Sequence, residues 1–144
     1  MDYINYNKTR HVELYNENQQ LKKKNSSLSK ENENKYIELL GYNAKLAEHH
    51  LWKNRRTYFS LINYLLDGEI DGNDFSEEFF RLYSRDNNSI SMSENPNDLS
   101  DGFSRYTEKI FFCCEDFDEE SVEYGEKWLK NEMSNILVEM KNKY

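Results

Sequence analysis

The chain has 144 residues, of which 37% are hydrophobic, and its mean hydropathy is -1.03. Phe, Trp and Tyr make up 15%, which supplies enough ring surface for one compact core but not for a core that recruits every residue. No apolar run approaches the roughly 20 residues that a membrane span needs, so we expect no transmembrane segment. One Pro and five Gly favour helices over a turn-rich β fold.

Charge is distributed unevenly along the chain. Residues 1–50 carry eight Lys and Arg against seven Asp and Glu, whereas residues 51–144 carry eleven against twenty. The formal charges of +1 and -9 give the total of -8. Because the second part has no basic surface for phosphates, we expect no direct nucleic-acid binding. Such a part attracts a basic partner instead.

Residues 10–50 read as one polar helix within an N-terminal extension, residues 1–50. Leu14, Leu21 and Leu28 recur every seven residues, with Asn18, Asn25 and Asn32 at the intervening core-like positions. Two interpretations stay open: a solvated helix, or a coiled-coil-like docking helix through which the chain self-associates or binds a partner. The predicted docking residues keep a three-four spacing and are Ile37, Leu40, Ala44 and Ala47.

Residues 51–144 read as four amphipathic helices. The first has Trp52, Phe59, Ile62 and Leu66 on one face, flanked by Tyr58, Leu61 and Leu65, and Gly68 is placed to end it. Asp71 is the expected N-cap of the second. The second helix is expected to face inward with Phe75, Phe79, Leu82 and Tyr83. The third is expected to do so with Phe103, Tyr106, Ile110, Cys113 or Cys114, and Phe117, and the fourth with Leu129, Met133, Ile136, Leu137 and Met140.

These patterns predict an all-α fold, an antiparallel four-helix bundle with an N-terminal helical extension. A polar loop over residues 84–98 separates the two central helices. Since every strong apolar stripe lies after residue 50, we expect residues 51–144 to fold without residues 1–50.

The chain offers little catalytic chemistry. Its only histidines are His11, His49 and His50, which we expect to be solvated, and no phosphate-binding loop, nucleophile elbow or paired-Cys motif is present. Cys113 and Cys114 are adjacent, match no zinc spacing and are expected to act as small buried hydrophobes. We therefore expect no catalytic residue, no metal, no cofactor and no enzymatic activity.

The third and fourth helices are joined by an acidic run. Residues 115–126 contain seven acids and no base: Glu115, Asp116, Asp118, Glu119, Glu120, Glu123 and Glu126. Three interpretations stay open: a solvated face, a docking surface for basic groups, and a catalytic carboxylate pair.

Three segments together resemble a known family. They are LINYLLDGEIDGNDFSEEFFRLY (61–83), EKIFFCCEDFDEE (108–120) and LKNEMSNILVEM (129–140). In this order and spacing, over roughly residues 59–144, the chain resembles the self-protective colicin-like immunity proteins of the colicin D type. The resemblance implies a four-helix bundle that blocks a tRNA-cleaving toxin.

The same resemblance implies a binding site. Glu115, Asp118 and Glu120 match the family's acidic residues that face the basic active site of the toxin, and Asp116 and Glu119 lie among them. The chain departs from the family where Glu119 replaces a Pro, in the additional segment 1–50 and in a longer loop over 84–98.

Two functions follow as expectations. The first is an inhibitor that presents its acidic surface to a basic, ribonuclease-type protein. The alternative is a non-catalytic structural or assembly subunit of a larger complex, such as a plastid one, that docks through its N-terminal helix. The absence of an apolar leader predicts a soluble intracellular protein. The heavy use of Asn, Lys, Tyr and Ile suggests an AT-rich genome, so we expect the protein in either the bacterial cytoplasm or the plastid stroma.

Overall fold

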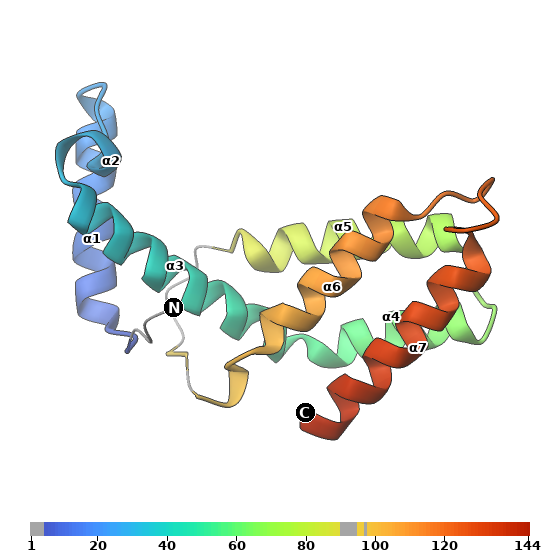
Figure 1. The fold of residues 1–144 in the computed structure, drawn as a ribbon. Helices are drawn as coiled ribbons and strands as arrows, with labels where there is room; N and C mark the ends of the chain where they lie inside the picture. Colours follow the sequence, from blue (N-terminus) through green and yellow to red (C-terminus); the bar gives the residue numbers. More distant parts are fainter. Residues whose placement is uncertain (1–4, 90–94, 97) are drawn as a thin grey trace.

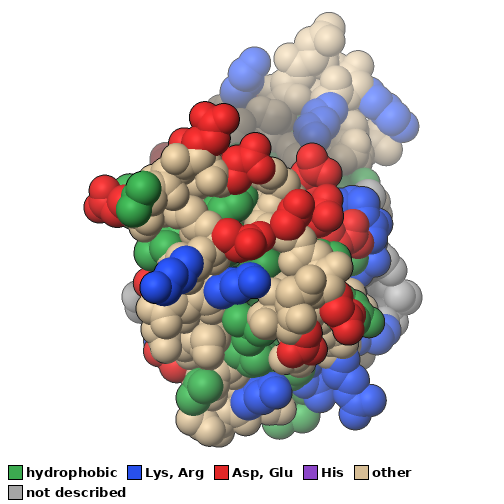
Figure 2. Space-filling model, turned by 90° about the vertical axis from the view of Figure 1, so that its right-hand side faces the viewer, with side chains coloured by type: hydrophobic (Ala, Val, Ile, Leu, Met, Phe, Trp, Pro, Cys, Tyr) green, Lys and Arg blue, Asp and Glu red, His purple; other side chains and the backbone are tan. Residues whose placement is uncertain are grey.

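The computed structural model describes residues 5–89, 95–96 and 98–144, and in these residues the chain is helical with no strand (Figure 1). The all-α prediction is confirmed. The elements are α1 (Lys8–Lys23), α2 (Leu28–Glu31), α3 (Glu33–Lys53), α4 (Arg55–Leu66), α5 (Gly72–Asn87), the short 3-10 helix η1 (Asp98–Ser100), α6 (Phe103–Asp116) and α7 (Glu126–Lys143). Helices α1 and α2 lie at one end, and the α4–α5 and α6–α7 connections lie at the other, which Figure 2 views directly.

The single helix expected over residues 10–50 is wrong, because the chain turns back between α1 and α3. Three asparagines account for the reversal. Asn25 has a left-handed φ of 60°, and the side chain of Asn18 accepts the backbone N–H of Leu28 at 2.9 Å. Asn32 caps α3 by accepting the N–H of Lys35 at 3.1 Å. Residues that resembled heptad core positions therefore serve in a turn and a helix cap, for which Asn is well suited.

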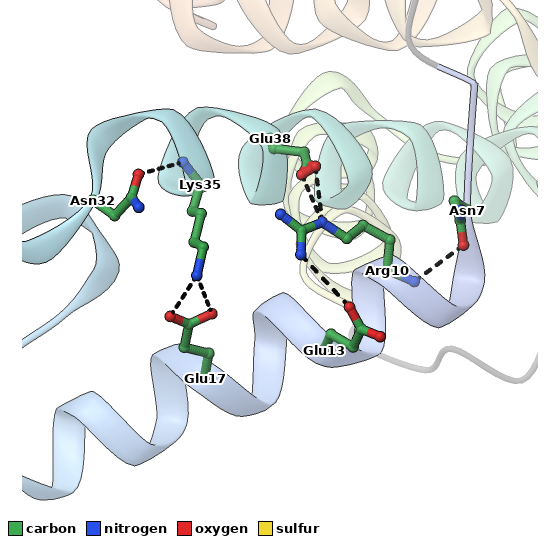
Figure 3. A network of polar contacts seen from close by, with 7 residues as sticks. All are labelled: Asn7, Arg10, Glu13, Glu17, Asn32, Lys35 and Glu38. Atoms are coloured by element: carbon green, nitrogen blue, oxygen red, sulfur yellow. Dashed lines mark hydrogen bonds and ion pairs between the residues drawn. The ribbon is translucent and has the colours of Figure 1, made fainter.

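Helix α1 packs against the first half of α3 around a small core of its own. This core consists of Leu14, Leu28, Leu39 and Tyr42. Two ion pairs join the same helices: Arg10 to Glu38 at 2.9 Å, and Lys35 to Glu17 at 3.0 Å (Figure 3). Because these pairs are partly exposed, we expect each to contribute at most about 1 kcal/mol. They fix the relative position of the two helices more than they stabilise them.

The expectation that the histidines are solvated is also wrong. His11 is fully buried: its Nδ1 lies 2.8 Å from the Tyr6 hydroxyl and its Nε2 lies 2.7 Å from Asn43 Oδ1. His49 and His50 are buried too, in the half of α3 that packs against α5 and α6. The chain reversal creates these surroundings, and local sequence does not reveal them.

The main core is shared by the end of α3 and by α4, α5, α6 and α7. The stripe predicted for α7 is buried at all five positions. On α4 the inward face is rotated from the predicted one: Tyr58, Leu61 and Leu65, expected as flanking residues, are buried with Ile62, while Phe59 and Leu66 are only partly buried. The neighbouring helices lie against that side of α4.

Helix α3 connects the extension to this core. The boundary predicted at residue 50 falls inside α3, and Leu51 near its end is buried in the main core. Glu48 accepts the backbone N–H of Gly102 at 3.1 Å and that of Ser104 at 3.3 Å, so its carboxylate caps the start of α6. A fragment of residues 51–144 would lack this cap. Whether such a fragment folds stays a prediction.

Helix α5 continues past residue 84, where the loop was predicted to begin, and it carries a buried acid, Asp86, in its last turn. Asp86 is 3% exposed and accepts the Tyr58 hydroxyl at 2.7 Å, the Asn54 amide at 3.0 Å and Arg85 Nε at 2.9 Å. It thereby joins the α3–α4 junction to the end of α5. Much of the predicted loop 84–98 lies outside the described residues.

The predicted signals at the α4–α5 corner are confirmed. Gly68 has φ 77° and donates its N–H to the Leu65 carbonyl at 3.1 Å, which ends α4. Asp71 caps α5 by accepting the N–H of Asp74 at 2.8 Å. These two residues set the course of the corner, which contributes to the surface described next.

Candidate functional site

The acidic run predicted from the sequence lies at the end of the molecule away from α1 and α2 (Figure 1). Three contacts hold the α6–α7 connection against the start of α5. Gly72 N–H donates to Glu126 Oε1 at 2.7 Å, Asn73 donates to Glu119, and the Phe117 ring lies on the Cα of Gly72. We call the surface formed by residues 67–78 and 115–126 the acidic end.

Gly72 is required for the close approach of the two segments. A Cβ at this position would lie 2.4 Å from Cζ of Phe117, too close for any real contact. Any larger residue would therefore displace the ring and the connection that follows it. In the sequence, Gly72 is recognisable only as part of a helix start, because the Phe117 ring that it contacts lies 45 residues further along the chain.

Internal hydrogen bonds give the connection a defined shape. Asp118 Oδ1 accepts the N–H of Glu120 at 3.0 Å, and the Asp118 N–H donates to the Tyr124 carbonyl at 3.0 Å. Tyr124 N–H in turn donates to Ser121 Oγ at 3.0 Å. The backbone of this segment and the Asp118 carboxylate are therefore held in place in the free chain, and an ordered segment loses less entropy on binding.

The five predicted contact residues are all exposed, but their surroundings differ. Glu115 and Asp116 occupy the last turn of α6, and Glu120 projects from the connection. Asp118 shapes the turn through its side chain, and Glu119 is held by Asn73. Glu115, Asp116 and Glu120 are thus the most available for a partner.

The position of Glu115 and Asp116 is unfavourable for stability. The C-terminal end of a helix carries partial negative charge, which disfavours carboxylates there by about 0.3–1 kcal/mol each. No Lys or Arg lies in the last turn of α6 to offset them. A structural role therefore does not explain these acids.

A second acidic segment, not predicted as part of a site, completes the surface. Between Thr57 and Phe80 the chain has no Lys or Arg but six acids: Asp67, Glu69, Asp71, Asp74, Glu77 and Glu78. In Figure 2, Asp and Glu side chains form a band across this end, with exposed hydrophobic side chains between them and Lys and Arg below and beside it. A count of charges reveals this run, but only the fold brings it beside residues 115–126.

A hollow of about 240 Å³ marks the junction of the two segments. Its lining includes Asp71, Glu119 and Glu126, whose carboxylates already accept hydrogen bonds from α5. In the described part of the chain, no three His, Cys, Asp or Glu side chains are arranged to hold a metal ion. The chemistry that this surface offers is the acceptance of ammonium or guanidinium groups.

The two cysteines lie just before the acidic end. Cys114 is buried and Cys113 half-buried, and neither forms a disulfide. Burial raises the pKa of Cys113 to about 11, with help from the charges of Glu132 and Asp116, and raises that of Cys114 to about 12. Thiolate chemistry is thereby suppressed at neutral pH.

These raised pKa values predict a loss of stability at alkaline pH. Unfolded thiols ionise near about pH 8.5, so the unfolded chain releases protons before the folded one does. We expect the thiols to leave the free energy of unfolding unchanged below this pH and to lower it progressively as pH rises from there through about 11–12. Urea titrations from pH 7 to pH 11 test this, and a variant with both cysteines changed to Ala should show a shallower decline. An equal decline in that variant would exclude the thiols as the cause.

The predicted docking helix is only partly available. Ile37 is 58% exposed, Leu40 is 46% exposed and Ala44 is exposed, all on the outer side of α3. Ala47 is 8% exposed and belongs to the buried part of the helix. The apolar surface of the extension is therefore the patch Ile37, Leu40 and Ala44, which we call the α3 patch.

Comparison of the chain with protein-family models, with curated proteins and with solved structures finds no match. Among the described helices, none combines the length and the apolar character that crossing a membrane requires.

Proposed function

We propose that this protein is an inhibitor of the immunity type, which holds its acidic end against the basic site of a ribonuclease-type protein. The observation that carries the proposal is the meeting of two base-free acidic segments, residues 67–78 and 115–126, on one ordered end. The resemblance to colicin-like immunity proteins supports it independently. In this proposal α4 to α7 form the family's four-helix bundle, and α3 is an addition to it.

Electrostatics explains how such a surface would act. Thirteen acids gathered without a base destabilise the folded chain by mutual repulsion, so a purely structural surface would gain from interspersed Lys. A cationic site that normally binds nucleic-acid phosphates would relieve the repulsion. The carboxylates carried by this ordered connection would occupy that site and exclude the substrate.

The proposal is tested by the rate of complex formation. The partner is captured from the native extract with the tagged full chain, and its association is measured at about 0.05 M and about 0.5 M salt. We expect the association rate constant to fall at least about tenfold, because screening removes electrostatic steering. A rate that does not change with salt, or a partner without a basic surface, would contradict the proposal.

A second candidate function, an assembly subunit, is favoured by the α3 patch. Ile37 and Leu40 lie on one helix face and are 58% and 46% exposed. Burying the exposed half of each side chain would stabilise a complex by about 1 kcal/mol per residue. In this case the partner would cover α3, and the acidic end would be a solvated face.

The α3 patch gives a prediction that separates the two functions. Changing both Ile37 and Leu40 to Glu should leave the thermal melt nearly unchanged, since both are exposed. If the chain is an assembly subunit, recovery of the partner should fall at least about tenfold. The matched control is Val138→Glu on α7, where an apolar side chain is 57% exposed. Full recovery with the double variant would exclude docking through α3.

A further inference from the structure

A groove between α4 and α5 lies at the edge of the acidic end, with which it shares Ile70, Asp74, Glu77 and Glu78. It has a volume of about 440 Å³, within the range of ligand pockets in proteins. Leu61 and Leu82 form its apolar floor, and Tyr64 and Ile70 flank it. Asp74, Glu77 and Glu78 of α5 line its other side.

The acidic rim of the groove is only partly explained by the fold. Asp74 lies in the first turn of α5, where a carboxylate is stabilised by the helix dipole, and Glu78 pairs with Arg81. Glu77 lies farther along the helix and takes part in no ion pair within the described residues. The rim therefore keeps net negative charge.

Of the apolar side chains that line the groove, Tyr64 and Ile70 are accessible, whereas Leu61 and Leu82 beneath them are buried. Tyr64 is 48% exposed although it lies one turn from the buried Leu61. Large exposed aromatic side chains next to an apolar floor are typical anchoring points in protein interfaces. An apolar floor beside a negative rim complements an apolar side chain flanked by cations.

We infer that this groove receives an amphipathic basic segment of the partner, one that packs a Leu-like or aromatic side chain against Tyr64 and Ile70, above Leu61 and Leu82, and places its Lys or Arg side chains beside Asp74 and Glu77. Helix-in-groove binding of this type is a recurring mode of recognition. The inference rests on the proposed function, since both require a basic partner. It adds an apolar contact on α4 and α5 to the contacts that residues 115–126 supply.

The two surfaces are close enough for one partner to cover both. The backbone N–H of Asp74 donates a hydrogen bond to the Asp71 side chain. Asp71 also lines the hollow, together with Glu119 and Glu126. The first turn of α5 thus separates the groove from the α6–α7 connection. A partner that extends from the α6–α7 connection across this turn reaches Asp74 at the rim of the groove.

A synthetic probe tests the groove without the partner. The probe is a helical peptide of Leu and Lys about 14 residues long, and its control has Ser in place of Leu at the same charge. At about 0.15 M salt we expect the Leu peptide to bind at least about tenfold more tightly and to shift amide resonances of residues 57–82. Equal binding of the two peptides, or shifts confined to other residues, would overturn the inference.

Variants make the test specific. The double change Tyr64→Ser with Glu77→Gln should weaken binding of the Leu peptide about tenfold or more. The matched control is Phe112→Ser with Glu108→Gln, which removes an exposed aromatic ring and an exposed carboxylate from α6. Equal effects of the two variants would count against the groove. Glu77→Lys alone, at an exposed position, gives a second variant in which folding is preserved.

The captured partner separates failure of this inference from failure of the proposed function. If changes at Glu115 and Glu120 weaken the complex but the groove variant does not, the inference fails and the proposed function stands. If the changes at residues 115–120 do not weaken the complex, the proposed function fails. In that case the inference about the groove stands or falls with the binding of the Leu peptide. If both weaken the complex, both are supported.

Discussion

Changing Glu115 to Gln, Asp118 to Asn and Glu120 to Gln together is expected to weaken binding of the basic partner at least about thirtyfold. Truncating one member of a buried, hydrogen-bonded charge pair costs about 2–5 kcal/mol, and every 1.4 kcal/mol is a factor of ten. The fold should persist, because the amide that replaces the Asp118 carboxylate keeps an oxygen that can accept the N–H of Glu120. Removing charge from the end of α6 should even raise stability slightly.

A charge-matched control isolates the effect of position. The changes Glu33→Gln, Glu108→Gln and Glu139→Gln remove the same charge from exposed positions on α3, α6 and α7. Affinities of the two triple variants are compared by calorimetry at two salt concentrations. Equal affinities would assign residues 115–120 to a solvated face and remove the basis for docking at the acidic end.

The second large effect is expected at Asp86, where a change to Ala should lower the free energy of unfolding by about 2–4 kcal/mol, because polar groups that it bonds would lose their acceptor. Asp86 accepts the hydrogen bond of the buried Tyr58 hydroxyl, and it also bonds Asn54 and Arg85. Its replacement by Ala takes this acceptor away from the buried Tyr58 hydroxyl and the half-buried Asn54 amide. Burial and this hydrogen bond also raise the pKa of Tyr58, as expected for a phenol that must stay protonated.

Two controls define the origin of that loss. Asp86→Asn retains an acceptor but removes the charge, so we expect a smaller loss of about 1–3 kcal/mol. Asp67→Ala, at an exposed residue at the C-terminal end of α4, should change stability by less than about 0.5 kcal/mol. Urea unfolding of the three variants measures these values. A loss at Asp86→Ala no greater than at Asp67→Ala would mean that the network does not stabilise the fold.

Local chemistry made part of the structure predictable. Gly68 and Asp71 end one helix and begin the next through contacts within four residues, and the stripe of α7 follows from a regular spacing. The acidic run at residues 115–126 is visible as composition alone. Each of these features depends on neighbours along the chain.

The remaining features depend on partners that are distant in the sequence. Asn18 and Asn32 suggested heptad positions, yet the chain reverses there, and His11 is buried against Asn43, 32 residues away. Glu48 caps a helix 54 residues further on. The second acidic segment could be counted in the sequence, but its position beside Glu119 and Glu126 follows from the packing of α5 on the α6–α7 connection.

The most direct test of the docking surface is to map the contact itself. The full chain is labelled with ¹⁵N, and amide resonances are recorded with and without the partner captured from the native extract. The proposed function predicts that the largest shifts fall on residues 67–78 and 115–126, while those of α1 and of Ile37 to Ala44 stay unchanged. Shifts confined to α1 and α3, with the acidic end unaffected, would contradict it.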